Sequence, residues 1–168
     1  MSSKLKKIVF FVLFIGCVSD PVSPEGDFLI TGNSIGRVKL GQRKEEVIAS
    51  YRDRQVKEVD LFLEGMPAPA VQVYDQGALL LTAELDLDKG TVYRISTRNQ
   101  RFRTKEDIGV GSTIGAVKSK YGAPESVGQG EGELYVVFEF QTGVLSVAVD
   151  ADFPKESSKI IDVLIVGK

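Results

Sequence analysis

The sequence contains no histidine, no tryptophan and a single cysteine in 168 residues. Without histidine, a Ser-His-Asp triad, a Cys-His nucleophile pair and a His-Glu-x-x-His zinc site are excluded. With one cysteine, Cys17, no disulfide can form inside the chain. These absences predict that the protein is not an enzyme, and we expect neither a cofactor nor a metal site.

A strong charge of either sign is also absent, because the formal net charge is −2 at pH 7. Proteins that bind nucleic acid need a basic surface to meet the phosphates. A weakly acidic chain therefore predicts that nucleic acid is not a partner. Its partners are expected among proteins, lipids or small molecules.

A run of apolar residues, "IVFFVLFI", occupies positions 8–15. As a helix it would be about 12 Å long, too short for a hydrocarbon core of about 30 Å. Three lysines precede the run and Gly16 closes it, which is the order of a secretory signal. We therefore predict a signal peptide at residues 1–16, followed by a flexible tether at 17–27 that contains two prolines and no periodic pattern.

The end of this segment, Phe14-Ile15-Gly16-Cys17, resembles the lipobox of bacterial lipoproteins. The resemblance implies that the Cys17 thiol is acylated and that the chain is cut just before it. We accordingly expect a lipoprotein of the bacterial cell envelope, held to a membrane by its N-terminal lipid and facing the periplasm or the exterior. The alternative is an ordinary signal peptide that is cut elsewhere and leaves Cys17 discarded or free.

Two segments of the chain align with each other, which indicates an internal repeat. "VKLGQRKEEVIASY" at 38–51 matches "IGVGSTIGAVKSKY" at 108–121, with Gly41 opposite Gly111. Each segment has the spacing of a short amphipathic helix, and Ser112 or Thr113 can cap the second helix.

Stretches of alternating apolar residues follow both helices, as antiparallel strands require. The sequence therefore predicts an α+β fold made of two tandem repeats, 28–105 and 106–168. Each repeat is expected to be a short helix followed by an antiparallel meander sheet, with the helices packed on one sheet face.

The segment "GSTIGAVKSKYGAPE" resembles the Gly-Met-Thr-x-x-x-Val-x-x-x-Leu-Gly-x-Pro motif of BamE/SmpA-type outer-membrane lipoproteins. Two such units in tandem resemble the β-lactamase inhibitor protein fold. The resemblance implies a binding protein that acts in assembly or inhibition. It implies no individual site residues, because Ser112 replaces the methionine and the first copy lacks Gly-x-Pro.

The best candidate for a binding surface is the sheet face opposite the helices. Period-two alternation gives Leu79 and Leu81 to the helix side and leaves charged and aromatic residues on the other face. The predicted partner-binding residues are Phe62, Tyr74, Glu84, Arg94, Arg98 and Tyr135. Aromatic and arginine side chains are frequent anchors of protein interfaces, so these residues predict a protein-binding module. The alternative is a small-ligand or envelope-polymer site in the groove between the repeats, which requires a mostly apolar cavity there.

Two further patterns have simpler explanations. Residues 86–90 ("DLDKG") and 150–152 ("DAD") resemble fragments of a calcium loop, but turn chemistry accounts for them. The run 94–105 holds four arginines and one lysine. It could meet anionic lipid or an acidic partner, unless its charges pair with neighbouring carboxylates.

Overall fold

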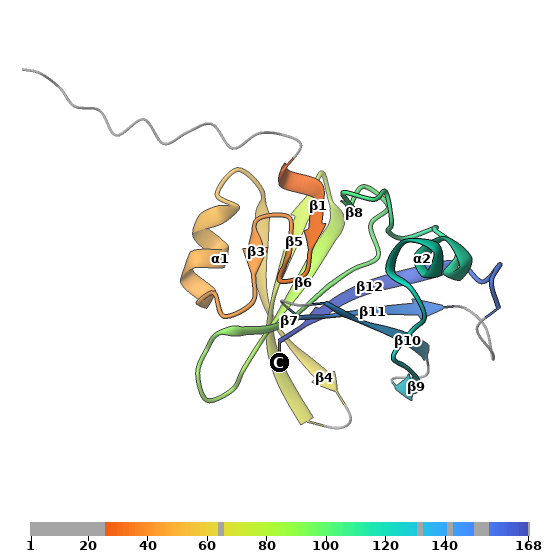
Figure 1. Ribbon diagram of the computed structural model, residues 1–168. Helices are drawn as coiled ribbons and strands as arrows, with labels where there is room; N and C mark the ends of the chain where they lie inside the picture. The colour runs from red at the N-terminus through yellow and green to blue at the C-terminus, as the bar shows by residue number, and fades with distance from the viewer. Residues whose placement is uncertain (1–25, 64–65, 131–132, 141–142, 150–154, 168) are drawn as a thin grey trace, which may run out of the picture.

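The computed structural model describes residues 26–63, 66–130, 133–140, 143–149 and 155–167 (Figure 1). The predicted signal peptide, Cys17, residues 18–25 of the predicted tether and segment 150–152 lie outside the described residues. In the described part of the chain, no helix is long and apolar enough to cross a membrane.

Eight antiparallel strands form the main sheet, in the order β4-β5-β6-β7-β12-β11-β10-β9. Their bounds are Gln55–Leu63 (β4), Met66–Asp75 (β5), Ala78–Leu85 (β6), Val92–Thr97 (β7), Ser126–Gly130 (β9), Glu133–Phe140 (β10), Gly143–Val149 (β11) and Ile160–Val166 (β12). The strands β4 to β7 form one meander and β9 to β12 another. The two meanders join where β7 pairs with β12, with Ile95 opposite Ile165.

A smaller sheet has the order β3-β2-β1-β8. Its strands are Leu29–Thr31 (β1), Ser34–Ile35 (β2), Val38–Lys39 (β3) and Arg103–Thr104 (β8). The pair β1 and β8 is parallel, whereas β1, β2 and β3 pair antiparallel. The sequence patterns do not predict these strands, because two or three residues are too few to show an alternating period.

The helices α1 (Lys44–Ser50) and α2 (Ile114–Tyr121) lie inside the two aligned segments. As predicted, α2 has a hydroxyl cap: Thr113 Oγ1 accepts the backbone N–H of Ala116 at 3.2 Å. Its end is marked by Gly122, whose φ of 87° is the conformation that glycine adopts readily. A single 3-10 turn, η1 (Gly26–Phe28), precedes β1.

One hydrophobic core connects both helices with both sheets. Val47 of α1 and Val117 of α2 are fully buried in the same cluster as Ile35 of the small sheet and Ile95 of the main sheet. Phe102, in the loop before β8, is also fully buried in it. The helices, the small sheet and this loop therefore pack on one face of the main sheet and share its core. The charged side chains described below lie on the other face of the main sheet.

The predicted fold class is wrong. The chain is mainly β, with two sheets and only two short helices in its described parts, instead of two α+β repeats. A helix of seven or eight residues is only about 11 Å long, whereas eight strands span about 34 Å. Two such helices cannot cover the sheet, so the small sheet and the loop complete the core. In two separate sheets, β7 and β12 would each be an exposed edge strand. Here they pair with each other instead.

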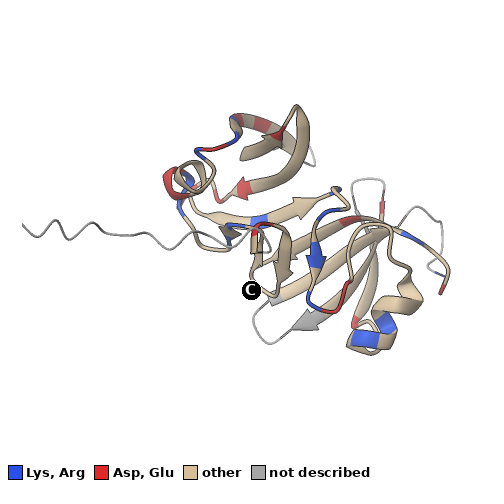
Figure 2. Cartoon of the chain, turned by 90° about the horizontal axis from the view of Figure 1, so that it is seen from above, with Lys and Arg blue, Asp and Glu red and all other residues tan. Residues whose placement is uncertain are grey.

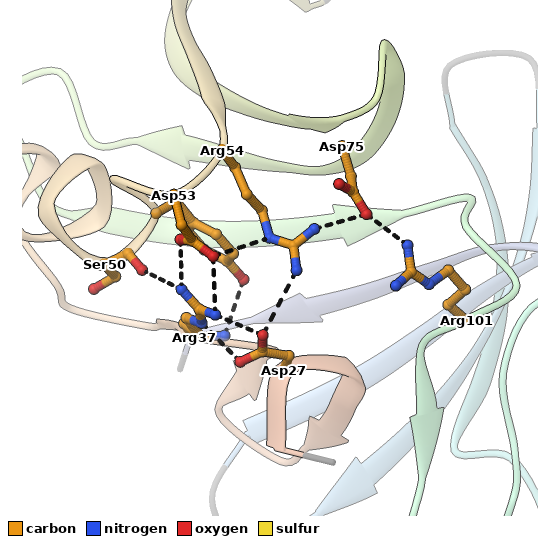
Figure 3. A network of polar contacts seen from close by, with 8 residues as sticks. Asp27, Arg37, Ser50, Asp53, Arg54, Asp75 and Arg101 are labelled. Atoms are coloured by element: carbon orange, nitrogen blue, oxygen red, sulfur yellow. Dashed lines mark hydrogen bonds and ion pairs between the residues drawn. The ribbon is translucent and has the colours of Figure 1, made fainter. Parts of the chain in front are cut away.

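A network of three arginines and three aspartates, here called the entry network, attaches η1 to the rest of the fold (Figure 3). Its members are Asp27, Arg37, Asp53, Arg54, Asp75 and Arg101. Arg37 Nε donates to Asp27 Oδ1 at 2.7 Å, and Arg101 Nη1 donates to Asp75 Oδ2 at 2.7 Å. The Arg101 guanidinium also lies 3.8 Å from the ring centroid of Phe28. Because the six charges balance, the network offers no net charge to a ligand. Its role is to hold η1 next to the last residue of β5, Asp75.

Candidate functional site

The main sheet has an outer face, which points away from the core. Along β6 and β7, Ala83 and Ile95 belong to the core whereas their neighbours Glu84 and Arg94 do not, as strand alternation requires. Five of the six predicted partner-binding residues lie on this face. They are Tyr74, Glu84, Arg94, Arg98 and Tyr135.

Glu84 forms the most buried charged group of the outer face, with 2% of its surface exposed. Arg94 Nε donates to its Oε1 at 2.7 Å, and the Tyr93 hydroxyl donates to its Oε2 at 2.9 Å. Tyr93 and Arg94 are consecutive, yet both reach Glu84 because a bulge places Tyr93 as an extra residue between the pairs Glu84–Arg94 and Leu85–Val92. The sequence predicted that Glu84 and Arg94 bind a partner, but in the structure they form an ion pair with each other.

A second charged group lies further along the same face. Arg98 Nε donates to Asp162 Oδ2 at 3.0 Å, and its Nη2 donates to Glu133 Oε1 at 2.7 Å. Burial raises the pKa of the Asp162 carboxyl, and the hydrogen bond from Arg98 only partly opposes this shift. The Tyr135 hydroxyl lies 3.3 Å from Glu133 Oε2. The Arg98 side chain is 65% exposed, so this group stays accessible to a partner.

The two remaining predicted residues are placed differently. Tyr74 is half-buried on the outer face, where its hydroxyl bonds Gln72 and the Lys57 ammonium lies 4.6 Å from its ring centroid. Phe62 is 76% exposed but lies on the core-side face of the sheet. It is an even number of residues from Val56 on β4, so both side chains point to the same face, and Val56 packs against the core. The structure therefore brings Tyr74, Arg94 and Arg98 to one face and separates Phe62 from them.

A groove of about 580 Å³ lies where the two halves of the chain meet, and we call it the junction groove. One wall is β1 with Gly32, the opposite wall is the end of α2 with Lys120 and Tyr121, and the residues 104–106 close one side. Ile30 and Leu145, both buried in the core, supply its apolar floor. Leu29 adds an apolar side chain that is 37% exposed. The volume falls within the range of about 300–1,000 Å³ that is typical of small-molecule sites.

Polar groups converge on one side of the junction groove. The Tyr121 hydroxyl lies 2.8 Å from Thr104 Oγ1 and 2.7 Å from Glu106 Oε2. Burial raises the pKa of Tyr121 to about 12, and the nearby Glu106 carboxylate adds to this effect. Tyr121 is therefore neutral at physiological pH and holds Glu106 by donating a hydrogen bond. Lys105 lies 3.5 Å from Glu106, whereas Lys120 has no ion-pair partner among the described residues.

Sequence reasoning expected a groove between the halves as an alternative site but named none of its residues. Tyr121 was considered only as the end of the second aligned segment, and the strand β1 was not predicted. The one available signal is the alignment of Tyr51 with Tyr121, since both hydroxyls make polar contacts in the structure: Tyr51 Oη accepts the backbone N–H of Arg37 at 3.0 Å. Nothing in the local pattern indicates that β1 and α2 face each other.

The turn explanation for residues 86–90 and charge pairing in the run 94–105 agree with the structure, whereas 150–152 lies outside the described residues. Asp86 Oδ1 accepts the backbone N–H groups of Asp88 and Lys89, both at 3.0 Å, and these bonds lower the pKa of Asp86. In the described part of the chain, no group of three or more Asp, Glu, His or Cys side chains is placed to hold a metal ion. In the run 94–105 all five cations pair with carboxylates; the partners are Glu84 for Arg94, Asp162 and Glu133 for Arg98, Asp75 for Arg101, Asp107 for Arg103 and Glu106 for Lys105.

The chain matches no protein-family model and no curated protein. Among solved structures, it is similar in fold to the crystal structure of the uncharacterized protein YfeY from Escherichia coli, with a TM-score of 0.60. The superposition covers 82% of this chain and 99% of YfeY, and the two sequences are 10% identical. At this identity the likeness shows a shared fold and nothing about activity.

Proposed function

We propose that this protein is a lipid-anchored binding protein of the bacterial cell envelope, and that it holds a small amphipathic anion in the junction groove. The anchor is inferred from the lipobox-like segment that ends at Cys17. The observation that carries the binding function is the groove itself, because it combines a ligand-sized volume, an apolar floor and a cation at the rim.

The ligand chemistry follows from the lining. Ile30 and Leu145 favour an alkyl or aryl group, since covering apolar surface is stabilised by about 25 cal/mol per Å². Lys120, whose ammonium has no carboxylate partner in the described residues, favours a carboxylate or phosphate head. On the other side Glu106, already held by Tyr121, repels a second negative group and orients the head toward Lys120.

Dodecanoate, which joins an alkyl chain to one carboxylate, is a suitable probe for calorimetric titration of the purified chain. Lys120→Glu should weaken its binding about fivefold, as expected for one exposed ion pair worth about 1 kcal/mol. Leu29→Ser should also weaken it, because apolar lining is lost. Lys39→Glu is the matched control, since Lys39 is exposed and lies outside the groove. Absence of binding, or equal losses in Lys120→Glu and Lys39→Glu, would contradict the proposal.

The second candidate function is protein binding through the outer face, and the accessible Arg98 group favours it. Crosslinking in native membranes should capture a partner, and Tyr74→Ala should weaken the capture while leaving the melting temperature nearly unchanged. Arg94 is unsuitable for this test, because its loss would unpair the buried Glu84. Kinship with the BamE/SmpA-type lipoproteins stays a prediction from the segment 111–125.

A further inference from the structure

The strand β5 extends beyond its neighbour β6 at one end of the main sheet. The last pair between them is Ala70 with Glu84, so residues 66–69 pair only with β4. This part of β4 and β5 forms an arm beside the turn that joins β6 to β7. Two neighbouring clefts, of about 350 and 490 Å³, lie between the arm and the turn and share Leu87 in their lining.

The most exposed large hydrophobic residues of the described chain gather at this end. Phe62 is 76% exposed, Leu87 70% and Met66 65%, whereas Leu79 and Val127, elsewhere on the sheet, are 43% and 49% exposed. Met66 and Leu87 line one cleft together with Tyr93. Phe62 lies on the same arm but on its other face, and it lines neither cleft. We call Met66, Leu87 and Tyr93 the arm-end surface.

The clefts beside the arm-end surface are acidic. Their lining includes the carboxylates of Glu45, Glu58, Asp60, Asp86 and Asp88. Among the described residues of this lining, the single cation is Lys44, and its ammonium already lies 2.8 Å from Glu58 Oε2. In Figure 2, α1 and the β4–β5 arm both carry acidic residues on one side of the molecule. A partner that covers these carboxylates must bring positive charge.

We propose that the arm-end surface docks a protein segment in which apolar side chains stand next to lysine or arginine. The apolar residues enter the cleft between Met66 and Leu87, and the cations pair with Asp60 and Asp88. This docking function is separate from ligand binding in the junction groove and does not depend on it.

Other occupants fit the surface less well. An anionic membrane is disfavoured, because five carboxylates would face its charge. Addition of a partner strand to β5 is disfavoured as well, since Pro67 and Pro69 provide no backbone N–H. The arm end also lies at the opposite end of β5 from Asp75, which the entry network holds near η1 (Figure 1). With ten residues, β5 places Met66 about 30 Å from Asp75.

A fluorescein-labelled peptide of alternating lysine and leucine serves as the probe, and fluorescence anisotropy measures its binding to the purified full-length chain. The double variant Met66→Ser/Leu87→Ser should bind about tenfold more weakly, as expected for the loss of central anchors. The matched control is Leu79→Ser/Val127→Ser, which removes two exposed apolar residues outside the surface. All four side chains are exposed, so the melting temperatures of both variants should stay close to that of the parent chain.

Charge is tested in the same assay. Asp60→Asn/Asp88→Asn should weaken binding and reduce its salt dependence, whereas Asp107→Asn, whose side chain is 91% exposed elsewhere, should not. The proposal is overturned if the Lys-Leu peptide does not bind, or if Met66→Ser/Leu87→Ser binds as well as its control. It is equally overturned if a Lys-Ser or Glu-Leu peptide binds as tightly. A dimer that Leu87→Ser dissociates, or phosphatidylglycerol vesicles that bind through Leu87, would assign the surface to a different occupant and overturn it too.

Discussion

Removal of Arg94 tests whether the outer face is built around a buried ion pair. The Glu84 side chain is 3% exposed and that of Arg94 is 19% exposed, with 2.7 Å between Arg94 Nε and Glu84 Oε1. In Arg94→Ala the carboxylate stays buried and loses its cation, while the Tyr93 hydroxyl remains as a donor. Breaking a buried pair in this way typically costs about 3–5 kcal/mol. Because the Tyr93 donor remains and Arg94 is partly exposed, we expect the free energy of unfolding to fall by about 3 kcal/mol.

Urea and thermal unfolding measure this loss directly. For a chain of this size, a loss of about 3 kcal/mol lowers the melting temperature by about 6–12 °C. Lys89→Ala is the control, because the Lys89 side chain is 75% exposed and its ammonium lies 3.9 Å from Asp86; its loss should cost less than about 0.5 kcal/mol.

A double-mutant cycle separates the ion pair from simple loss of packing. In a Glu84→Leu background, Arg94→Ala should cost little, because no buried carboxylate is left without a cation. The coupling free energy between the two positions should therefore be about 2 kcal/mol or more. The reasoning is refuted if Arg94→Ala costs less than about 1 kcal/mol, or if the two substitutions are additive.

Three further predictions concern the anchor, the entry network and a helix cap. Cys17→Ser should leave the precursor uncleaved or move the protein to the soluble fraction, and unchanged membrane fractionation would refute the lipid anchor. The hydrogen bond from Arg101, helped by Arg54 and opposed by desolvation, lowers the pKa of Asp75, so its contribution to stability is complete above about pH 5 and is lost as the pH falls through the lowered pKa. Urea unfolding should thus show a gap between the parent chain and Asp75→Asn that is larger at neutral pH than in acid; a gap independent of pH would argue against the pairing. Thr113→Ala should cost about 1 kcal/mol through loss of the α2 cap, whereas Arg43→Ala, at the matching position of α1, should spare its cap because a guanidinium cannot accept a hydrogen bond.

Elements that depend on local chemistry could be predicted from the sequence. The starts of α1 and α2 follow from amphipathic spacing, and the cap of α2 follows from a hydroxyl at the right position. The β5–β6 turn follows from its glycine, since Gln76 and Gly77 have φ values of 50° and 85°, as a two-residue hairpin needs. Alternation along β7 correctly predicted that Arg94 lies on the outer face. Each of these signals lies within a few residues of the feature that it predicts.

Irregular pairing escaped prediction because it breaks the period of two. A bulge inserts Leu80 between the pairs Val73–Leu81 and Tyr74–Leu79, so Leu80 and Leu81 are both buried and Leu79 is 43% exposed, against the prediction that Leu79 and Leu81 share the core face. The placement of Phe62 depends on the β4–β5 register, which pairs it with Pro67. A shift of one residue would have moved Phe62 to the outer face, and strand composition alone does not set that register.

By itself the sequence determined the local elements, the absence of histidine-based chemistry and the lipobox-like motif, since each is written in neighbouring residues. Only the tertiary structure decided that β7 pairs with β12, which turns two predicted repeats into one sheet. It also decided that Glu84 is buried against Arg94, and that β1 and α2 enclose the junction groove. These features join residues that are distant in the chain, and their free energy comes from shared burial and strand pairing. No local pattern carries that information, because the same strands could satisfy their alternation equally well in two separate sheets.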